Sequence, residues 1–431
     1  MIRRTNRRQF LQHSALAAAG FWVASRPTTG QTRSPNEKLN LGIIGVNHRG
    51  KANLAGVKSE NIAALCDVDD SYLGEAAKQY PKAKTYTDWR KLLEQKDIDG
   101  VVISTTDHTH APASIMAMKL GKHVYCEKPL AHNVHEARVV GETYRKGKVA
   151  TQMGTQIHAS SNYRRVVELV RAGAIGPVRE AHVWCGRVSG PGSRPTETPP
   201  VPKNLNWDLW LGPAPYRPYH PVYLPGNLTW NRWWDFGNGT LGDMGSHLID
   251  LPFWALELRH PASVEAEGPP VDAEINPAWM IVRWEHPARN GRPAVKLVWY
   301  HGGKRPELPA GIDASKWFNG ILFVGDKGML LADYNRRLLL PEDRFKDYKA
   351  PEPSIPESPG HYAEWIHACK SGAPTLCNFD YAGALIENNL LGNVAYRVGK
   401  KLQWDPVKLA AINCPEAAQY VRREYRKGWE V

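Results

Sequence analysis

The sequence has little cysteine and no long hydrophobic run. Six cysteines in 431 residues are too few for a fold that depends on disulfides. No apolar run reaches the roughly 18 residues that a membrane-spanning helix needs, so we expect no membrane span. Hydrophobic residues make up 42% and charged residues 23% of the chain, which is typical of globular proteins and excludes a largely disordered chain. The length leaves room for two or three domains.

A concentrated band of basic residues is also lacking outside the N-terminus. The formal net charge is +12, but six arginines within residues 1–33, a segment without any acid, supply half of it. The rest of the chain is only mildly basic, and Glu424 follows the pair Arg422 and Arg423 near the C-terminus. Proteins that bind nucleic acid carry a denser positive surface, so we expect no nucleic-acid partner.

The first 33 residues have the order of regions that secretory signals share. Arg7 and Arg8 precede an apolar pair, a modestly apolar stretch follows at 15–24, and small residues stand at its end. The adjacent arginines resemble a twin-arginine signal, a route known for exporting proteins already folded. The alternative is a basic amphipathic helix of the mature fold, which the small residues at 17–20 disfavour because they pack poorly. We therefore expect residues 1–33 to be a signal peptide and linker, and the protein to be periplasmic or otherwise extracytoplasmic.

Two further domains follow, which together predict an α/β fold. Residues 38–157 alternate between short apolar strands and helical stretches, such as 73–79, 112–120 and 134–146, a pattern typical of a parallel sheet covered on both faces. Residues 158–431 contain longer, half-exposed strands and a closing helix at 381–398, and they predict an α+β domain with an open, largely antiparallel sheet. The strands expected in the first domain are 41–46, 61–66, 100–104, 123–126 and 149–153.

The first expected strand ends in a broken form of the dinucleotide-binding fingerprint. The loop reads Gly45-Val46-Asn47-His48-Arg49-Gly50. Asn47 replaces the middle glycine, and we expect the loop to persist because Asn tolerates a left-handed φ. Alone, this loop fits an ordinary strand–turn–helix equally well. Asp67 shifts the balance, because it ends the second strand, where an acid hydrogen-bonds the adenosine ribose and repels a 2′-phosphate. We therefore expect NAD, with NADP disfavoured.

Three motifs, in order along the chain, resemble the glucose–fructose oxidoreductase / inositol dehydrogenase / MocA (Gfo/Idh/MocA) family. They are Thr105-Thr106-Asp107-His108-Thr109-His110, then Glu127-Lys128-Pro129, then Gly242-Asp243-Met244-Gly245-Ser246-His247-Leu248-Ile249-Asp250. The resemblance covers about 39–405, and a tryptophan-rich segment at 207–213 is similar to exported bacterial members. It implies a Rossmann domain followed by an α/β domain whose open sheet often mediates oligomers, so we expect a homo-oligomer.

The resemblance also implies roles for single residues. Lys128 would lie beside the reacting carbon, with a cis bond to Pro129, and Asp243 and His247 would complete a catalytic acid/base group. Family members often have Arg where this chain has His158, which leaves a substrate contact there open. The implied cofactor-binding residues, beyond the glycine loop and Asp67, are Thr105, Thr106, His108, His110, Glu127, Lys128 and Gln156.

The residue types in the third motif suit removal of a hydroxyl proton during hydride transfer. Asp243 and His247 are four residues apart, so they share one face if residues 242–251 form a helix. A carboxylate beside an imidazole raises its basicity, which suits a general base, although the same pair could serve as an intrahelical cap. A positive nicotinamide beside Lys128 should lower the pKa of Lys128 and so favour its neutral amine form. Asp250 could join them around a cation, but H-E-x-x-H and C-x-x-C motifs are lacking, so we expect no metal site.

Cysteine and aromatic residues leave two alternatives open. Cys66 and Cys126 end predicted strands and are expected to be buried, whereas Cys369 and Cys377 could pair. Aromatic residues crowd 207–236, where they could line a carbohydrate cleft or pack a long loop, and we favour packing for most of them. They are Trp207, Trp210, Tyr216, Tyr219, Tyr223, Trp230, Trp233, Trp234 and Phe236.

Three functions remain open from the sequence. The first is an NAD-dependent oxidoreductase that acts on a sugar, polyol or glycoside, with a tightly bound, recycled cofactor. The second is a glycoside hydrolase or lyase that oxidises its sugar transiently, which would use the same Lys128, Asp243 and His247. The third is a non-catalytic NAD-binding protein, which the presence of those three residues together disfavours.

Overall fold

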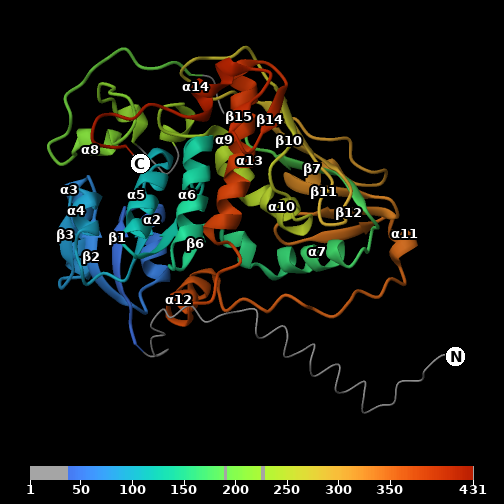
Figure 1. Cartoon of the computed structure of the whole chain (residues 1–431), viewed down its shortest axis with the longest axis horizontal. Coiled ribbons are helices and arrows are strands. Elements are labelled where there is room, and N and C mark those ends of the chain that lie inside the picture. Colours follow the sequence, from blue (N-terminus) through green and yellow to red (C-terminus); the bar gives the residue numbers. More distant parts are fainter. Residues whose placement is uncertain (1–36, 189–191, 225–228, 431) are drawn as a thin grey trace.

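A computed structural model describes residues 37–188, 192–224 and 229–430. Figure 1 shows two α/β bodies side by side, with strands β1 to β6 in one, strands β7 to β13 in the other, and the long helix α13 between them. The expected signal peptide at residues 1–33 lies outside the described residues. None of the helices in the described ranges is long and apolar enough to cross a membrane.

The first body is the expected parallel sheet. Its strand order is β3-β2-β1-β4-β5-β6, and every paired strand runs parallel to its neighbour. The expected strands form within a few residues of their predicted bounds, and one short strand, β3, was not foreseen. The bounds are β1 Asn40–Ile44, β2 Asn61–Cys66, β3 Lys84–Tyr86, β4 Gly100–Ile103, β5 His123–Cys126 and β6 Thr151–Met153.

Helices α2 to α6 connect these strands, and capping side chains fix several of their starts. Asp69 caps α3 by accepting from the backbone N–H groups of Ser71 and Tyr72, and Asn133 caps α6 in the same way. Each cap satisfies backbone donors that the first turn of a helix leaves free. The bounds are α2 Arg49–Gly56, α3 Asp70–Gln79, α4 Trp89–Leu93, α5 Asp107–Lys119 and α6 Val134–Lys146.

Helix α5 starts earlier than the sequence indicated, with Pro112 inside it rather than at its beginning. A proline has no N–H, so the carbonyl oxygen of His108, four residues earlier, has no donor within the helix. That oxygen accepts a 2.6 Å hydrogen bond from Arg423 of the C-terminal tail. The tail therefore compensates for the interruption of the helix.

The second body is a nine-stranded mixed sheet of order β13-β12-β11-β7-β10-β9-β8-β14-β15. Among the described strands of this second sheet, only β7 and β10 pair in parallel and the other pairs are antiparallel, so the expectation of a largely antiparallel sheet is confirmed. The bounds are β7 Val178–Cys185, β8 Ser263–Glu267, β9 Met280–His286, β10 Val295–His301, β11 Asn319–Gly325, β12 Gly328–Ala332, β13 Arg337–Leu340, β14 Leu402–Asp405 and β15 Ala410–Ala411.

The helices of the second half include the one that carries the third motif, α9. The expected helix at 242–251 is divided into α9 and α10 at Ile249. The bounds are α7 Ser161–Arg171, α8 Trp207–Leu211, α9 Gly239–Leu248, α10 Asp250–Ala255, α11 Glu342–Phe345, α12 His361–Ser371, α13 Phe379–Val398 and α14 Ala418–Val421, with a short 3₁₀ helix, η1, at Gln156–Ala159.

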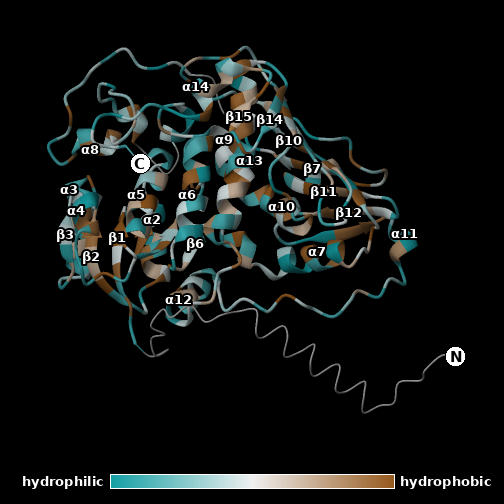
Figure 2. Ribbon diagram, in the orientation of Figure 1, coloured by the Kyte–Doolittle hydropathy of each residue, from teal (hydrophilic) through white to brown (hydrophobic). Residues whose placement is uncertain are grey.

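Two helices late in the chain pack on the first body. The buried helix α13 lies against α6, where Arg138 forms an ion pair of 2.8 Å with the buried Glu387. Trp365 of α12 is fully buried in a core cluster that also contains Leu41 and Tyr125 of the parallel sheet. Figure 2 shows apolar residues on these packed elements. The N-terminal body therefore obtains part of its core from residues beyond 360, which a boundary at 157 did not anticipate.

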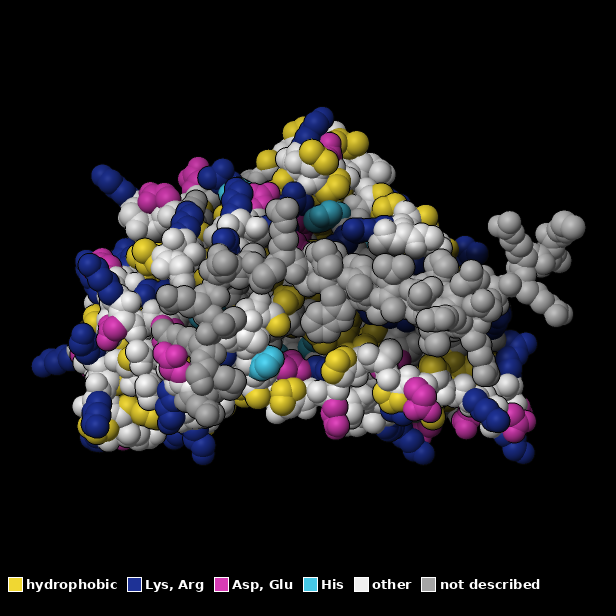
Figure 3. Space-filling view, turned by 60° about the horizontal axis from the view of Figure 1, so that its bottom comes forward, with side chains coloured by type: hydrophobic (Ala, Val, Ile, Leu, Met, Phe, Trp, Pro, Cys, Tyr) yellow, Lys and Arg dark blue, Asp and Glu magenta, His cyan; other side chains and the backbone are white. Residues whose placement is uncertain are grey.

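All six cysteines are buried and free, so Cys369 and Cys377 form no disulfide. Cys66 and Cys126 are buried at strand ends, as expected. Figure 3 shows, over the part of one face that is drawn in colour, lysines and arginines interspersed with acidic side chains rather than gathered in one broad band. This distribution agrees with the mild charge of the body of the chain.

Candidate active site

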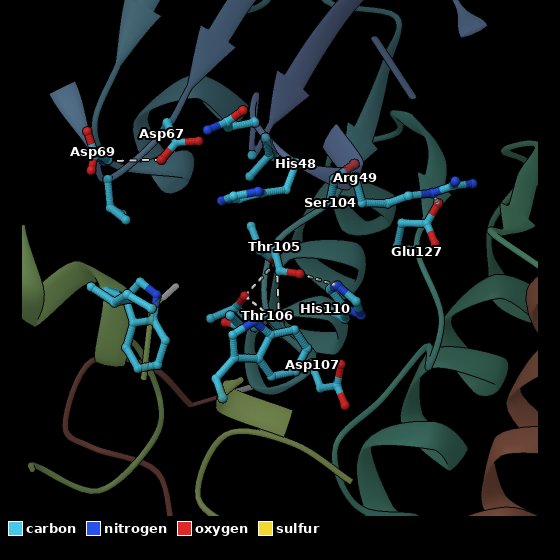
Figure 4. A pocket seen from close by; sticks show the side chains of 18 of the residues that line it. His48, Arg49, Asp67, Asp69, Ser104, Thr105, Thr106, Asp107, His110 and Glu127 are labelled. Carbon is cyan, nitrogen blue, oxygen red and sulfur yellow. Dashed lines mark hydrogen bonds and ion pairs between the residues drawn. The ribbon is translucent and has the colours of Figure 1, made fainter. Parts of the chain in front are cut away.

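A cavity of about 560 Å³ lies where the carboxyl ends of the parallel strands meet the second body. This is the edge at which open α/β sheets bind their ligands. The cavity walls come from the loops after β1, β2, β4 and β5, from α8 and α9, from residues around 202–210, and from Tyr219, Leu224 and Trp230. Figure 4 shows Asp67 and Asp69 at one end of it and Glu127 and Asp107 toward the other.

The loop after β1 packs so closely against neighbouring backbone that two of its positions require glycine. Gly45 has a φ of +85°, and a Cβ there would lie 2.6 Å from the carbonyl oxygen of Ser104. A Cβ on Gly50 would lie 2.1 Å from the carbonyl oxygen of Gly45. The left-handed residue that we expected at Asn47 is instead His48, whose φ is 49°. Asn47 keeps an ordinary φ, and its carbonyl oxygen accepts a 2.8 Å hydrogen bond from the N–H of Gly50.

Asp67 is placed as an acceptor for the hydroxyls of a ribose. Its Oδ2 accepts from the N–H of Val46 at 2.9 Å, and its Oδ1 accepts from the N–H of Asp69 at 3.1 Å. Burial raises the pKa of Asp67, the two backbone donors oppose that effect, and the result is a pKa of about 6. Above that pH the carboxylate is ionised and can accept from a ligand.

A segment of the second body, residues 204–206, closes over this end of the cavity. Leu205 forms an isolated antiparallel bridge with Asp69. The backbone carbonyl of Asn204 accepts from the N–H of Asp70, and the N–H of Asn206 donates to the carbonyl of Val68. The side-chain amide of Asn204 also donates to Asp69 at 3.0 Å. We call residues 204–206 the clamp. It joins the two bodies beside Asp67.

Glu127 lies in a buried hydrogen-bond network at the opposite end. Its Oε1 accepts from Arg49 and Asn53 at 3.0 Å and from Gln156 at 2.9 Å. Tyr362 of α12 donates to Asn53, so the helix from beyond residue 360 supports this network as well. The cavity lining thus brings together Arg49, Glu127 and Gln156, three of the expected cofactor-binding residues.

The residues of the first motif, 105–110, lie partly in the cavity lining and partly in the core. Thr105, Thr106 and His110 line the cavity. The His110 ring lies 2.7 Å from the carbonyl oxygen of Pro129 and 3.0 Å from that of Thr105, and burial lowers its pKa, so a neutral ring donates to one of them. His108 lies outside the cavity lining, where its ring nitrogens face the carbonyl oxygens of Trp210 and Phe236.

Lys128 and Asp243 form the centre of the site. The Lys128–Pro129 bond is cis, as expected, and Lys128 Nζ donates to Asp243 Oδ1. Arg187, which follows β7, donates to the other oxygen of Asp243. Burial would raise the pKa of Asp243, but the two cations outweigh it and lower that pKa to about 2. Asp243 is therefore a permanent carboxylate between two cations, and Arg187 is a site residue that the sequence analysis missed.

His247 lies on the same face of α9 and lines the cavity. Because the carboxylate oxygens of Asp243 bind Lys128 and Arg187, the expected direct support of His247 by Asp243 is not among the described hydrogen bonds. Burial and then the charge of Lys128 lower the pKa of His247 to about 3, although Asp243 opposes them. The imidazole is therefore neutral at physiological pH, and its basicity is lowered rather than raised as we expected.

His158 and Asp250 lie in a buried cluster of their own. Asp250 accepts from His158 Nδ1 at 2.9 Å and from the Tyr381 hydroxyl at 2.7 Å, and neither residue lines the cavity. The ring of His158 stacks on Trp254 at 3.9 Å. The nearest ligand atoms of His158, Asp250 and Cys377 lie within 4.8 Å of one another. Asp250 thus contacts His158 rather than the cations around Asp243.

Most of the aromatic residues at 207–236 pack together, as we expected. Tyr216 is 69% exposed, and Trp234 joins the main core. Three rings line the cavity: Trp210, Tyr219 and Trp230. These three rings belong to a separate buried apolar cluster, which also contains Trp207, Tyr223, Trp233 and Phe236.

Comparison with known proteins agrees with this geometry. The profile of an oxidoreductase family with an NAD-binding Rossmann fold, GFO_IDH_MocA, matches residues 39–155, and the profile of its C-terminal alpha/beta domain matches residues 179–291. The chain belongs to the Gfo/Idh/MocA family of oxidoreductases. The family match identifies the cavity as an NAD site, in agreement with the glycine loop and Asp67.

Several curated relatives share parts of the chain. A glycosyl hydrolase family 109 protein of Shewanella pealeana is 29% identical over 40% of this chain and 44% of its own length. An inositol 2-dehydrogenase of Salmonella paratyphi B is 30% identical over 33% of this chain and 43% of its own length. A levoglucosan dehydrogenase of Pseudarthrobacter phenanthrenivorans is 23% identical over 64% of this chain and 63% of its own length. The first two matches thus span less than half of those relatives.

Solved structures share the fold over most of the chain. A levoglucosan dehydrogenase in complex with NADH matches with a TM-score of 0.56 at 16% identity, over 85% of this chain and 98% of that one. The WlbA dehydrogenase from Bordetella pertussis, in complex with NADH and UDP-GlcNAcA, matches with a TM-score of 0.59 at 15% identity, over 86% and 99%. At these identities the similarity shows the two-domain fold.

Proposed function

We propose that the protein is an NAD-dependent oxidoreductase that oxidises a hydroxyl group of a sugar, polyol or glycoside. The observation that carries this proposal is the group of Lys128, Asp243, Arg187 and His247 in the cavity that also holds the glycine loop and Asp67. When bound, NAD supplies the hydride acceptor. The chain supplies groups that hold and move the hydroxyl proton.

Each of the four side chains has a distinct part. The nitrogen of Lys128 is the group we assign to the substrate oxygen, because the ionised Asp243 positions it and the Lys128 side chain, which is 15% exposed, lines the cavity. His247 is a neutral imidazole and can accept a proton. Arg187 neutralises Asp243, so Asp243 stays ionised even when Lys128 gives up its proton. Three aromatic rings in the lining, Trp210, Tyr219 and Trp230, suit the apolar face of a sugar ring.

A second candidate is a glycoside hydrolase or lyase that oxidises its sugar transiently and returns the hydride. The observation that favours it is the match to proteins named as glycosyl hydrolase family 109, one at 29% identity over 199 residues. A panel of glycosides and free polyols, incubated with the purified protein, separates the two. Net NADH formation identifies the dehydrogenase, whereas released sugar without net NADH identifies the hydrolase or lyase. A protein inactive on the whole panel would contradict both.

We also propose that the protein works outside the cytoplasm and retains its cofactor. The basis is the sequence of residues 1–33, together with the clamp, whose hydrogen bonds to Val68, Asp69 and Asp70 lie beside the ribose end of the cavity. An exported enzyme has little free NAD around it, so the cofactor must remain bound and be regenerated in place. The protein purified from the periplasm should release NAD on denaturation after gel filtration, as measured by absorbance and mass.

The clamp gives this retention a matched test. Asn204→Ala removes the side-chain bond to Asp69 and should increase the rate at which NAD is lost during gel filtration. Lys203→Ala changes the exposed neighbour outside the cavity lining and should leave that rate unchanged. If the unmodified protein is cofactor-free and needs a large excess of NAD, the retention proposal is wrong. The homo-oligomer that we expect from the open sheet is tested by light scattering on the same sample.

A further inference from the structure

Residues 426–429, which we call the latch, connect two helices that form opposite walls of the cavity. Trp89 of α4 lines the cavity on the first body, and Trp210 of α8 lines it on the second. The wall at Trp89 lies at the Asp67 end, since the N–H of Asp67 donates to the carbonyl of Tyr86 at the end of β3. Figure 1 shows the last part of the chain, in red, returning to the neighbourhood of α8.

The latch contacts α4 through a buried aromatic ring. Trp429 is only 7% exposed, and its ring centroid lies 5.9 Å from that of Trp89. The guanidinium of Arg90 lies 3.9 Å from the centroid of the Trp429 ring, a geometry in which a cation is attracted to the indole face. Arg90 also donates to the carbonyl of Gly428 at 3.3 Å. The end of the latch is therefore held against α4 by packing and by charge.

The beginning of the latch contacts the last turn of α8. Arg426 donates to the Asp208 side chain at 2.6 Å, to the Asp208 carbonyl at 2.7 Å and to the Gly212 carbonyl at 2.7 Å. The last turn of a helix leaves carbonyl oxygens without intrahelical donors, and a cation there also meets the negative end of the helix dipole. Arg426 therefore completes the end of α8 from a distant part of the chain.

A tight turn lets one short segment reach both helices. The N–H of Trp429 donates to the carbonyl of Arg426 at 3.1 Å, and Gly428 has a φ of +86°, which glycine adopts without strain. Because the turn joins Arg426 to Trp429, α4 and α8 cannot move apart unless one of the two contacts breaks. The clamp also joins the two bodies, but at the residues that follow β2 rather than at α4.

We propose that the latch is a gate for the cofactor, so that NAD enters and leaves the cavity only after the latch detaches from α4 or from α8. The proposal rests on the proposed function in that slow release serves the retention of the cofactor. No residue of the latch lines the cavity, so its contacts favour the closed form equally with and without NAD. Such a contact slows entry and exit by the same factor and leaves the affinity unchanged.

The kinetics of NADH binding to the full-length protein, freed of cofactor and followed by stopped-flow fluorescence, test the gate. Arg426→Ala and Trp429→Ala should each raise both the association and the dissociation rate constants about tenfold, the typical effect of losing hydrogen bonds to a charged group. The dissociation constant should stay nearly the same. Lys427→Ala is the matched control, because Lys427 is an exposed residue between the two and should leave both rate constants unchanged.

The double variant Arg426→Ala/Trp429→Ala distinguishes a gate from two independent contacts. Since breaking either end releases the latch, the double variant should be no faster than the faster single variant, and additive effects would overturn the proposal. Faster release with unchanged association would show that Trp429 only shapes the wall at Trp89, which would also overturn it. If Trp429→Ala does not fold, Arg426→Ala decides the question, because the Arg426 side chain is 20% exposed and leaves no cavity in the core.

The outcome for the gate is separate from the outcome for the proposed function. NADH binding is measured without any sugar, so a panel on which the protein is inactive would count against the proposed function alone. If the purified protein is cofactor-free but both variants accelerate association and release, the retention proposal is wrong and the gate stands. Rate constants equal to those of the wild type in both variants would overturn the gate, whatever the protein does to sugars.

Discussion

Arg423 donates a 2.6 Å hydrogen bond to the carbonyl oxygen of His108, the acceptor that Pro112 leaves free inside α5. The same guanidinium forms an ion pair of 2.8 Å with the fully buried Glu136 of α6. The C-terminal tail therefore supports α5 and α6, the two helices that follow the strands leading to the first motif and to Lys128.

Arg423→Ala should destabilise the protein by about 3 kcal/mol, because it leaves the Glu136 carboxylate buried with one cation fewer. Urea unfolding followed by fluorescence measures the loss. Arg422→Ala is the control, since Arg422 is exposed next to it and should change stability by less than about 0.5 kcal/mol. If the two substitutions destabilise the protein equally, the contacts of Arg423 with Glu136 and His108 do not stabilise the fold.

Lys128→Ala should abolish turnover while NAD remains bound. Lys128 contacts Asp243 at the catalytic end of the cavity, whereas the glycine loop and Asp67 hold the other end. Turnover is measured on the active substrate, and bound NAD is measured in the denatured protein. Lys119→Ala, an exposed lysine at the end of α5, should behave as wild type. Near-normal turnover of Lys128→Ala would contradict the catalytic assignment.

His247→Ala should reduce kcat by about 10²–10⁴-fold, the usual contribution of a general acid or base. The pKa of His247 is lowered to about 3, so the ring carries no positive charge across the physiological range. A much smaller loss, accompanied by a lower melting temperature, would favour the alternative in which Asp243 and His247 only stabilise α9. The rate and the melting temperature are therefore measured on the same preparation.

NAD affinity should fall as the pH drops below about 6, because the pKa of Asp67 is raised to about 6 and its protonated form accepts poorly from a ribose hydroxyl. The raised pKa also means that Asp67 favours folding most below its ordinary pKa, and that this contribution is lost as the pH rises through 6. Calorimetric titration of cofactor-free protein with NAD at pH 5 and pH 8 measures the difference. Asp67→Asn should remove it, and Asp70→Asn should retain it.

Local periodicity predicted the fold where burial follows a regular pattern. The strands β1, β2, β4, β5 and β6 are buried apolar runs and were identified within a few residues. Strand β3 was missed because its three residues, Lys84–Tyr86, are polar or half-exposed. The start of α5 was misplaced because Pro112 is typical of a first turn, and only the distant Arg423 makes an interior position tolerable.

The site was predicted only where its residues stand in local sequence patterns. Gly45, Asp67, Lys128, Asp243 and His247 stand in motifs, and the structure brings all five to one cavity. Arg187 follows β7 in a stretch without a periodic pattern, so no local signal marked it as a partner of Asp243. Asp107 lies within the first motif, but the sequence does not indicate its burial or its neighbours, which are properties of the fold.

The docking of α12 and the C-terminal tail has a consequence for the order of events during synthesis. The first 157 residues leave the ribosome before Trp365, which fills the core beneath their sheet, and before Arg423, which completes α5. The clamp and Arg187 also arrive after the strands that they meet. A nascent N-terminal half therefore lacks part of the wall that surrounds the cavity in the finished chain. If residues 1–33 direct export of the folded protein, a filled and closed cavity marks a molecule that is ready to leave.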